Sequence, residues 1–412
     1  MKLNKILACS LATLALTATQ TFAAGYSSNM YSTSGLSTAY AGSATGMHDS
    51  SDSFFNAATL SELEKGELII SVSYLDLDID LDNISGSNSS GTPQTSANDV
   101  SDAGEDGFVP SLYFAKPIND KTTFGLAITT PFGLATKYDQ GWIGSGNALD
   151  SQIATHNINP SISYKVTDKL NVAAGVQAQY YKATLTKDLY NVVSKSHGSD
   201  WGYGYNLGLL YKPTKNIKLG LGYRSKIDHK VAGTTNAPAA STFTPFNLST
   251  TTPESLDLGL SYKVNDKTEV AYDMVWTRWS RVNSLVVRNF HTLPDDTTTM
   301  NWHDSFLHSI GVSHKANEKL TLRAGTAYEK AAIGNANREP RLPAGDRIWT
   351  ALGFNYKLGN GLSVDASYVH MFFDDVNMST QASNVLSNSV NSVNANVDTK
   401  VNLYSIAVKK EF

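Results

Sequence analysis

Bulky apolar side chains recur at every second position along most of the chain after residue 66. In residues 215–226, isoleucine, leucine or tyrosine occupies the odd positions from 217 to 223, whereas lysine, glycine and arginine occupy the even positions. The same alternation is found in residues 170–181, 201–211, 256–264, 270–276, 320–328 and 348–358. A period of two indicates β-strands, because an amphipathic helix repeats every 3.6 residues. A soluble β-sandwich alternates in the same way, so this pattern alone leaves the architecture open.

The connections between these segments alternate in length. Six short polar turns are expected at residues 119–120, 167–168, 214–216, 265–266, 317–318 and 359–361. Seven longer connections, rich in serine, threonine and asparagine, are expected near 83–106, 132–152, 187–200, 230–252, 290–302, 331–345 and 376–397. Bacterial outer-membrane barrels have an even number of strands, with short turns at the periplasmic rim and long loops at the other. The sequence therefore predicts an all-β fold, a 14-stranded antiparallel transmembrane β-barrel.

The composition agrees with this fold and excludes several classes of protein. Only 17% of the residues are charged, against about 25% in typical soluble domains. No apolar run beyond the N-terminal region reaches the roughly 18 residues of a membrane-spanning helix. The net charge is −4, without a cluster of lysine and arginine, which argues against nucleic acid as a partner.

The N-terminus predicts export. Lys2 and Lys5 precede an apolar run over residues 6–18, and small residues stand at the −3 and −1 positions of a cleavage site after Ala23. This arrangement is typical of a secretory signal peptide, residues 1–23. The single cysteine, Cys9, falls within it, so no disulfide is expected in the mature chain.

Residues 24–66 are rich in serine, threonine, alanine and glycine and show no sustained alternation. A fourteen-strand barrel is wider than the eight-strand barrels that side chains alone can fill. We therefore expect this segment to form a plug, or hatch, inside a barrel formed by residues 67–412. A flexible periplasmic tail is the alternative.

Several motifs resemble the FadL-type outer-membrane transporters of long-chain fatty acids and other hydrophobic compounds. They include residues 24–26 (AGY), 34–36 (SGL), 39–42 (AYAG), 55–58 (FNAA), 131–136 (PFGLAT), 159–161 (NPS), 276–280 (WTRWS) and 342–343 (LP), followed by 346–349 (DRIW). The resemblance covers essentially the whole mature chain and implies fourteen strands and an N-terminal hatch in the bacterial outer membrane. The last residue, Phe412, resembles the terminal aromatic signal that the outer-membrane assembly machinery reads. A monomer surrounded by outer-membrane lipid is expected.

The resemblance also implies a transport route. A hydrophobic ligand binds at the outer surface, passes into a pocket inside the barrel, and leaves sideways into the bilayer when the hatch N-terminus moves. The hatch residues carried over are Ala24, Gly25, Tyr26, Asn56, Ala57 and Ala58. The family usually has Asn-Pro-Ala where this chain has residues 56–58, and losing the fixed φ of proline predicts a looser turn.

A lateral opening requires a strand that interrupts its ladder, which a central proline can do. The candidates are Pro110, Pro131 and Pro160, together with Gly125 in the favoured strand. The family kink lies in the third strand, which corresponds here to residues 121–131 and favours the region from Gly125 to Pro131. An ordinary strand end at Pro131 is the alternative.

Candidate ligand contacts follow from strand parity and loop composition. A fatty acid carboxylate in an apolar pocket needs a cationic partner, and the cations expected to point inward are Arg224, Lys226, Arg323 and Arg347. Asp257, Asp273, Glu329 and Asp365 are expected to point inward too, so interior salt bridges are the alternative. Apolar residues in the expected extracellular loops predict a binding site there, or loops that pack on themselves: Phe132, Leu134, Trp142, Phe243, Phe246 and Leu248.

Other functions are less compatible with the sequence. The tripeptides His48-Asp49-Ser50 and His303-Asp304-Ser305 contain triad residue types, but adjacent residues cannot converge as nucleophile, base and orienter. The histidines show no metal-ligand spacing, so we expect neither an enzyme nor a metal or other cofactor.

Alternating inward glycines at 202, 204, 220 and 222 leave room for a hatch. An aromatic-hydrocarbon channel of the same family and a general diffusion porin remain alternatives, although a porin would lack the hatch.

Overall fold

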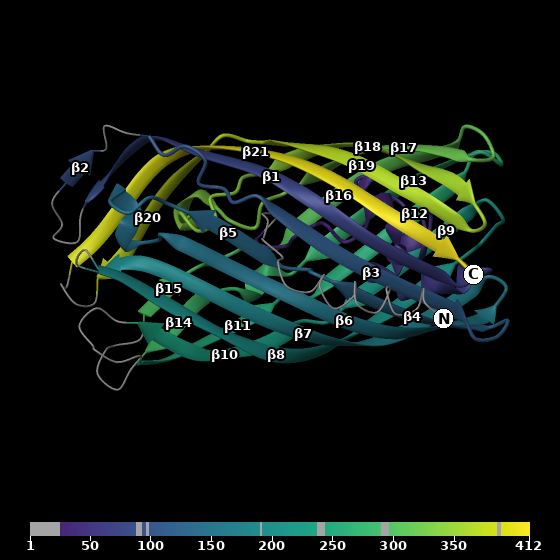
Figure 1. The fold of residues 1–412 in the computed structure, drawn as a ribbon, viewed down its shortest axis with the longest axis horizontal. Helices are drawn as coiled ribbons and strands as arrows, with labels where there is room; N and C mark the ends of the chain where they lie inside the picture. Colours follow the sequence, from purple (N-terminus) through teal and green to yellow (C-terminus); the bar gives the residue numbers. More distant parts are fainter. Residues whose placement is uncertain are drawn as a thin grey trace, which may run out of the picture.

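The computed structural model describes residues 25–87, 93–95, 99–189, 192–236, 244–289, 296–384 and 389–412. They form a closed antiparallel β-barrel of fourteen strands (Figure 1). The barrel closes because β1 (Glu67–Ser87) pairs with β3 (Gly107–Pro117) along one edge and with β21 (Ser389–Glu411) along the other. The predicted fold class is confirmed.

Eight of the fourteen passes are single strands in the described residues. Besides β1, β3 and β21, these are β6 (Asp150–Thr167), β7 (Leu170–Leu189), β8 (Val192–Tyr211), β17 (Leu320–Glu329) and β18 (Arg347–Gly359). The other six passes are each interrupted: β4 (Thr122–Thr129) and β5 (Gly133–Lys137), β9 (Ile217–Arg224) and β10 (Ile227–Asn236), β11 (Thr244–Thr252) and β12 (Ser255–Lys263), β13 (Thr268–Thr277) and β14 (Ser284–Asn289), β15 (Asp296–Thr299) and β16 (Ser305–Lys315), and β19 (Leu362–Phe373) and β20 (Val376–Asn384). A short β2 (Pro93–Thr95) pairs with the end of β1.

All six predicted turns connect neighbouring strands, but the predicted loops are too long. The described residues within 187–200, 230–252 and 376–397 form strands, so the barrel wall extends well beyond its turn-bearing half (Figure 1). Along β1 in this extension, Leu75, Leu77, Ile79 and Leu81 are buried, whereas the intervening aspartates are partly exposed. An outward face of aspartates is compatible with strands that have left the hydrocarbon, where that face need not be apolar.

Side chains alternate between the two faces of the wall as predicted. Leucine, isoleucine, valine and tyrosine point outward in the turn-bearing half; Leu352 is 57% exposed and Ile310 62% exposed. Tyr164, Tyr211 and Tyr262 are exposed near strand ends, where an aromatic girdle is expected. Among the described residues, no helix is long and apolar enough to cross a membrane.

Residues 25–66, called the hatch from here on, fold inside the barrel (Figure 1). The hatch contains α2 (Thr33–Leu36) and three 3-10 turns, η1 (Ser43–Thr45), η2 (Ser50–Phe54) and η3 (Ala57–Glu62). Three further 3-10 turns lie in connections: η4 (Ile143–Gly146), η5 (Trp279–Arg281) and η6 (Asn335–Asn337). Gly66 and Phe412 exchange backbone hydrogen bonds of 3.0 and 2.9 Å, which ties the end of the hatch to the C-terminus.

Candidate functional site

The hatch is held to the wall by a carboxylate on β13. Asp273 accepts hydrogen bonds from the backbone N–H groups of Gly42 and Ala44, each at 2.7 Å. Gly42 has a φ of 92°, a conformation that favours glycine and that helps to aim both N–H groups at one carboxylate. Asp273 is 1% exposed, so these bonds are made away from water, where charge-assisted bonds are strong.

Glycines on the wall allow the hatch backbone to approach closely. A Cβ on Gly222 would overlap the carbonyl oxygen of Phe55, and a Cβ on Gly220 would overlap that of Ala44. These two glycines make room for the hatch, as predicted. The prediction is wrong for positions 202 and 204, whose nearest neighbours are residues 225–229 in and beside β10.

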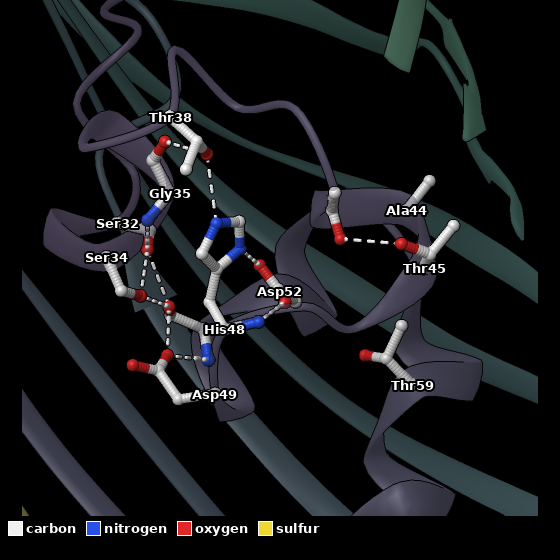
Figure 2. A network of polar contacts seen from close by, with 12 residues as sticks. Ser32, Ser34, Gly35, Thr38, Ala44, Thr45, His48, Asp49, Asp52 and Thr59 are labelled. Carbon is white, nitrogen blue, oxygen red and sulfur yellow. Dashed lines mark hydrogen bonds and ion pairs between the residues drawn. The ribbon is translucent and has the colours of Figure 1, made fainter. Parts of the chain in front are cut away.

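A polar network stabilises the interior of the hatch (Figure 2). His48 lies 2.9 Å from Asp52 through Nδ1 and 2.9 Å from the hydroxyl of Thr38 through Nε2. Burial raises the pKa of the Asp52 carboxyl, and the contact with His48 opposes that effect. The Thr38 hydroxyl is also hydrogen-bonded to backbone carbonyls of the hatch, and none of the three residues lines the cavity described below. The network therefore holds the hatch together rather than forming a catalytic site.

The turn at Asn56 is closed by hydrogen bonds of its own side chain. The amide nitrogen donates to the carbonyls of Ala44, at 2.7 Å, and Leu209, at 2.9 Å, and its oxygen accepts from the N–H of Ala58. Ala57 and Ala58 are buried. The bonds of Asn56 thus close the turn in the absence of the proline.

The wall is interrupted at Pro131. The strand β4 ends at Thr129 and β5 begins at Gly133, and β3 pairs with β4 no further than Leu112. The first hatch residues occupy this break: the Ser28 N–H donates to the Pro131 carbonyl at 2.9 Å, and the Gly133 N–H donates to the Tyr26 carbonyl at 2.7 Å. The hatch N-terminus therefore supplies hydrogen bonds that the neighbouring strand does not.

The other kink candidates, Pro110, Gly125 and Pro160, lie within continuous strands. Gly125 is paired on both sides, and a Cβ there would overlap Leu60 of the hatch. Pro160 lacks an N–H, and the Asn159 side-chain amide donates instead to the Val176 carbonyl at 2.7 Å. Of the candidates, only Pro131 lies where a strand ends, although the pairing of β6 with β7 also skips Asn159 and Pro160.

Aromatic rings fix the hatch N-terminus beside this break. The Tyr26 ring lies 5.7 Å from Phe132, 4.9 Å from Trp279 and 5.9 Å from Trp302. Gly25 has a φ of 62° and packs against the Trp279 ring. Ala24 lies outside the described residues. Trp302 gave no signal in the sequence, because it follows a long connection without alternation.

A narrow cavity lies between the hatch and the wall, beside the interruption at Pro131. About 70 Å³ is open to the centre of a water molecule, which is room for a handful of waters. Its lining includes aromatic residues of the hatch, residues at the interruption of the wall and charged residues of the wall. Among them are Tyr31, Phe54, Phe132, Arg224, Asp257 and Glu329. A hydrocarbon chain needs more space than this cavity provides.

The four predicted cations differ in their environment. Arg224 is buried and donates to the Phe54 carbonyl at 3.0 Å, to Asn159 at 3.1 Å and to Gln177, and among the described residues no carboxylate forms an ion pair with it. Arg323 is bound to Asp365 at 2.6 Å, and Arg347 to Glu329 at 2.8 Å. For Arg323 and Arg347 the structure supplies the interior salt bridges that were the alternative.

The predicted inward orientation of Lys226 is wrong. Its ammonium lies 2.6 Å from Asp228, and both side chains are largely exposed. Ser225 and Lys226 form the interruption between β9 and β10. This interruption changes the parity, so that Ile227 and His229 become the buried residues.

The predicted extracellular apolar residues are mostly buried and do not form one patch. Leu134 and Leu248 line a second, largely apolar pocket together with Tyr26, Tyr181, Met300 and Trp302. Phe132 lines the first cavity instead, and Trp142 stacks on Tyr138 with 4.3 Å between the ring centroids. Phe243 and the side chain of Phe246 lie outside the described part of the chain. The sequence also missed an ion pair lining the second pocket, Arg341 with Glu339 at 3.1 Å.

Comparison with known proteins gives consistent matches along the chain. The family described as Outer membrane protein transport protein (OMPP1/FadL/TodX) matches residues 14–412. The long-chain fatty acid transport protein of Salmonella typhi is 26% identical over 401 residues, covering 87% of this chain and 90% of that protein. A Pseudomonas aeruginosa FadL homologue has a similar fold, with a TM-score of 0.86 and 23% identity over 94% of this chain and all of that one. The Ralstonia pickettii toluene transporter TbuX also shares the fold, with a TM-score of 0.69 and 20% identity over 93% of this chain and 99% of that one.

Proposed function

Because the chain belongs to the outer membrane protein transport protein family (OMPP1/FadL/TodX), we propose that it takes up long-chain fatty acids or similar hydrophobic molecules. The family consists of outer-membrane transporters of hydrophobic compounds and not of enzymes, and this barrel resides in the outer membrane. The single observation that carries the proposal is a cavity bounded at once by the hatch, the wall interruption at Pro131 and the buried cation Arg224.

The interruption at Pro131 is the proposed lateral exit. Transfer of a hydrocarbon chain from the barrel to periplasmic water would cost about 0.8 kcal/mol per CH₂, or about 12 kcal/mol for fifteen methylenes, whereas sideways release into lipid avoids that cost. The hydrogen bonds of Tyr26 and Ser28 across the break support a hatch that blocks this exit until it moves.

A reversible covalent lock tests this exit. Ser27 and Phe132 face each other in an antiparallel bridge, a spacing compatible with a disulfide. In S27C/F132C, oxidation is expected to reduce oleate uptake by cells at least about tenfold, because it fixes the hatch across the break, and a reductant is expected to restore it. A lock within the wall, K315C/T321C on β16 and β17, should leave uptake unchanged. Equal uptake in both redox states of S27C/F132C would contradict the proposed exit.

Arg224 is the proposed partner of an anionic head group. Its guanidinium lines the cavity and faces the Phe54 ring at 4.3 Å. Hydrogen bonds to a charged group contribute about 1.5–3 kcal/mol, so Arg224→Gln is expected to weaken oleate binding by about tenfold to a hundredfold. The measurement is equilibrium binding of radiolabelled oleate to the protein in liposomes. Lys226→Gln, on the outer face of the wall, should bind like the parent protein, and equal weakening by both variants would overturn the role of Arg224.

The aromatic lining favours a second candidate ligand. Tyr31, Tyr40, Phe54, Phe55, Phe132 and Trp279 all border the cavity. Such rings suit an aromatic hydrocarbon as well as an acyl chain. In that case Arg224→Gln would leave toluene uptake unchanged, which separates the two candidates.

A further inference from the structure

One carboxylate in the cavity has no hydrogen-bond partner. Asp257 on β12 lines the cavity and is 4% exposed, and neither of its oxygens accepts a hydrogen bond from any described residue. The other inward carboxylates are partnered: Glu329 by Arg347, Asp365 by Arg323, and Asp273 by two hatch N–H groups. A buried carboxylate without a partner is unfavourable, so its presence calls for an explanation.

The wall around Asp257 supplies no side-chain donor opposite it. Its strand partners are Gly222 on β9 and Val275 on β13, and neither carries a polar side chain. Asp273, diagonally opposite on β13, is an acceptor that is already engaged with the hatch. Ser255 lies on the same face of β12 and also lines the cavity, but it forms no hydrogen bond with Asp257.

The hatch covers this part of the wall. The carbonyl of Phe55 packs directly on Gly222, the residue paired with Asp257. The Phe54 and Phe55 side chains line the same cavity. A ligand that displaces the hatch at Phe55 would therefore uncover Asp257 and present its own groups to the carboxylate.

We propose that Asp257 receives a hydroxyl group of the hydrophobic ligand, so that the transporter prefers hydroxylated acyl chains over their unsubstituted counterparts. The proposal rests on the proposed function, because it concerns the ligand of the same cavity. A carboxylate at this position would add a further acidic group beside the buried Asp257 and Asp273, and an ammonium group would have to lose its water beside the buried Arg224. A hydroxyl is neutral, donates a hydrogen bond, and adds little polar surface to an acyl chain.

The test compares oleate with ricinoleate and 2-hydroxyoleate, which carry one extra hydroxyl in mid-chain or beside the carboxylate. Equilibrium binding of each radiolabelled acid is measured on the full chain in liposomes, with protein-free liposomes subtracted. At least one hydroxy acid is expected to bind about threefold to tenfold more tightly than oleate, the net effect of one additional hydrogen bond. In Asp257→Leu, which cannot accept a hydrogen bond, this preference should disappear, while oleate binds at least as tightly as before.

Three controls keep the outcomes separate. Asp257→Asn keeps an acceptor oxygen and should retain part of the preference, whereas Asp228→Asn changes an exposed carboxylate and should retain all of it. Asp257→Leu should resist heat unfolding at least as well as the parent, because it removes a buried carboxyl group that has no hydrogen-bond partner among the described residues. Absence of a preference in the parent protein, or the same preference in Asp257→Leu, overturns the role of Asp257 alone. Failure of the parent to bind any of the three acids would instead overturn the proposed function.

Discussion

Replacement of Gly222 by alanine is expected to release the hatch and to let small hydrophilic solutes through the barrel. The added Cβ would overlap the Phe55 carbonyl, so hatch or wall must move. Overpacking of this kind costs about 1–3 kcal/mol, which shifts the equilibrium between docked and undocked hatch about 5- to 150-fold. The lumen of a fourteen-strand barrel is too wide for side chains to close it alone.

The measurement is the rate of nitrocefin hydrolysis by a periplasmic β-lactamase in intact cells that express the variant. Gly334→Ala is the matched control, because a Cβ there meets no atom closer than the His303 ring at 3.5 Å. An unchanged rate in Gly222→Ala, with the barrel folded as judged by heat-dependent migration in gels, would show that the hatch tolerates the side chain.

Removal of the Asp273 carboxylate is expected to undock the hatch more completely. Asp273→Ala removes two hydrogen bonds between a charged acceptor and the Gly42 and Ala44 N–H groups. At about 1.5–3 kcal/mol each, their loss corresponds to a shift in the docking equilibrium of more than about a hundredfold. Asp273→Asn retains one acceptor oxygen and should give an intermediate result.

A buried thiol reports this equilibrium. Ser43 is fully buried in the hatch and its hydroxyl has no hydrogen-bond partner in the described part of the chain, so Ser43→Cys is a mild change. Cys9, the single cysteine of the sequence, falls in the expected signal peptide, which leaves the introduced thiol alone in the mature chain. Maleimide labelling of Cys at 43 should accelerate in proportion to the undocked fraction. Asp266→Ala, in an exposed turn, should label at the parental rate; equal rates for Asp273→Ala would contradict the anchoring role.

The period-two alternation was sufficient to identify the strands and the inward side of most of them. It gave the orientation of Arg224, Asp257, Asp273 and Glu329 correctly, because parity is conserved along an uninterrupted strand. It failed at Lys226, since the interruption between β9 and β10 reverses the parity and leaves no mark in composition. The pattern also predicted loops where the structure has strands, because the outward residues of these strand extensions are polar, as loop residues are.

The all-β barrel, the six short turns and a small-residue segment enclosed by the wall could all be predicted from the amino-acid sequence. These follow from local chemistry: side-chain period, turn residues and the lack of alternation before residue 67. The pairing of the interior charges, in contrast, depends on the tertiary structure. Arg323 meets Asp365, and Asp273 meets N–H groups 231 and 229 residues away, whereas Asp257 is paired with Gly222 and Val275 and accepts no hydrogen bond from any described residue. Such partnerships depend on strand register and on the docking of the hatch, which bring distant residues together and cannot be read from neighbours in the chain.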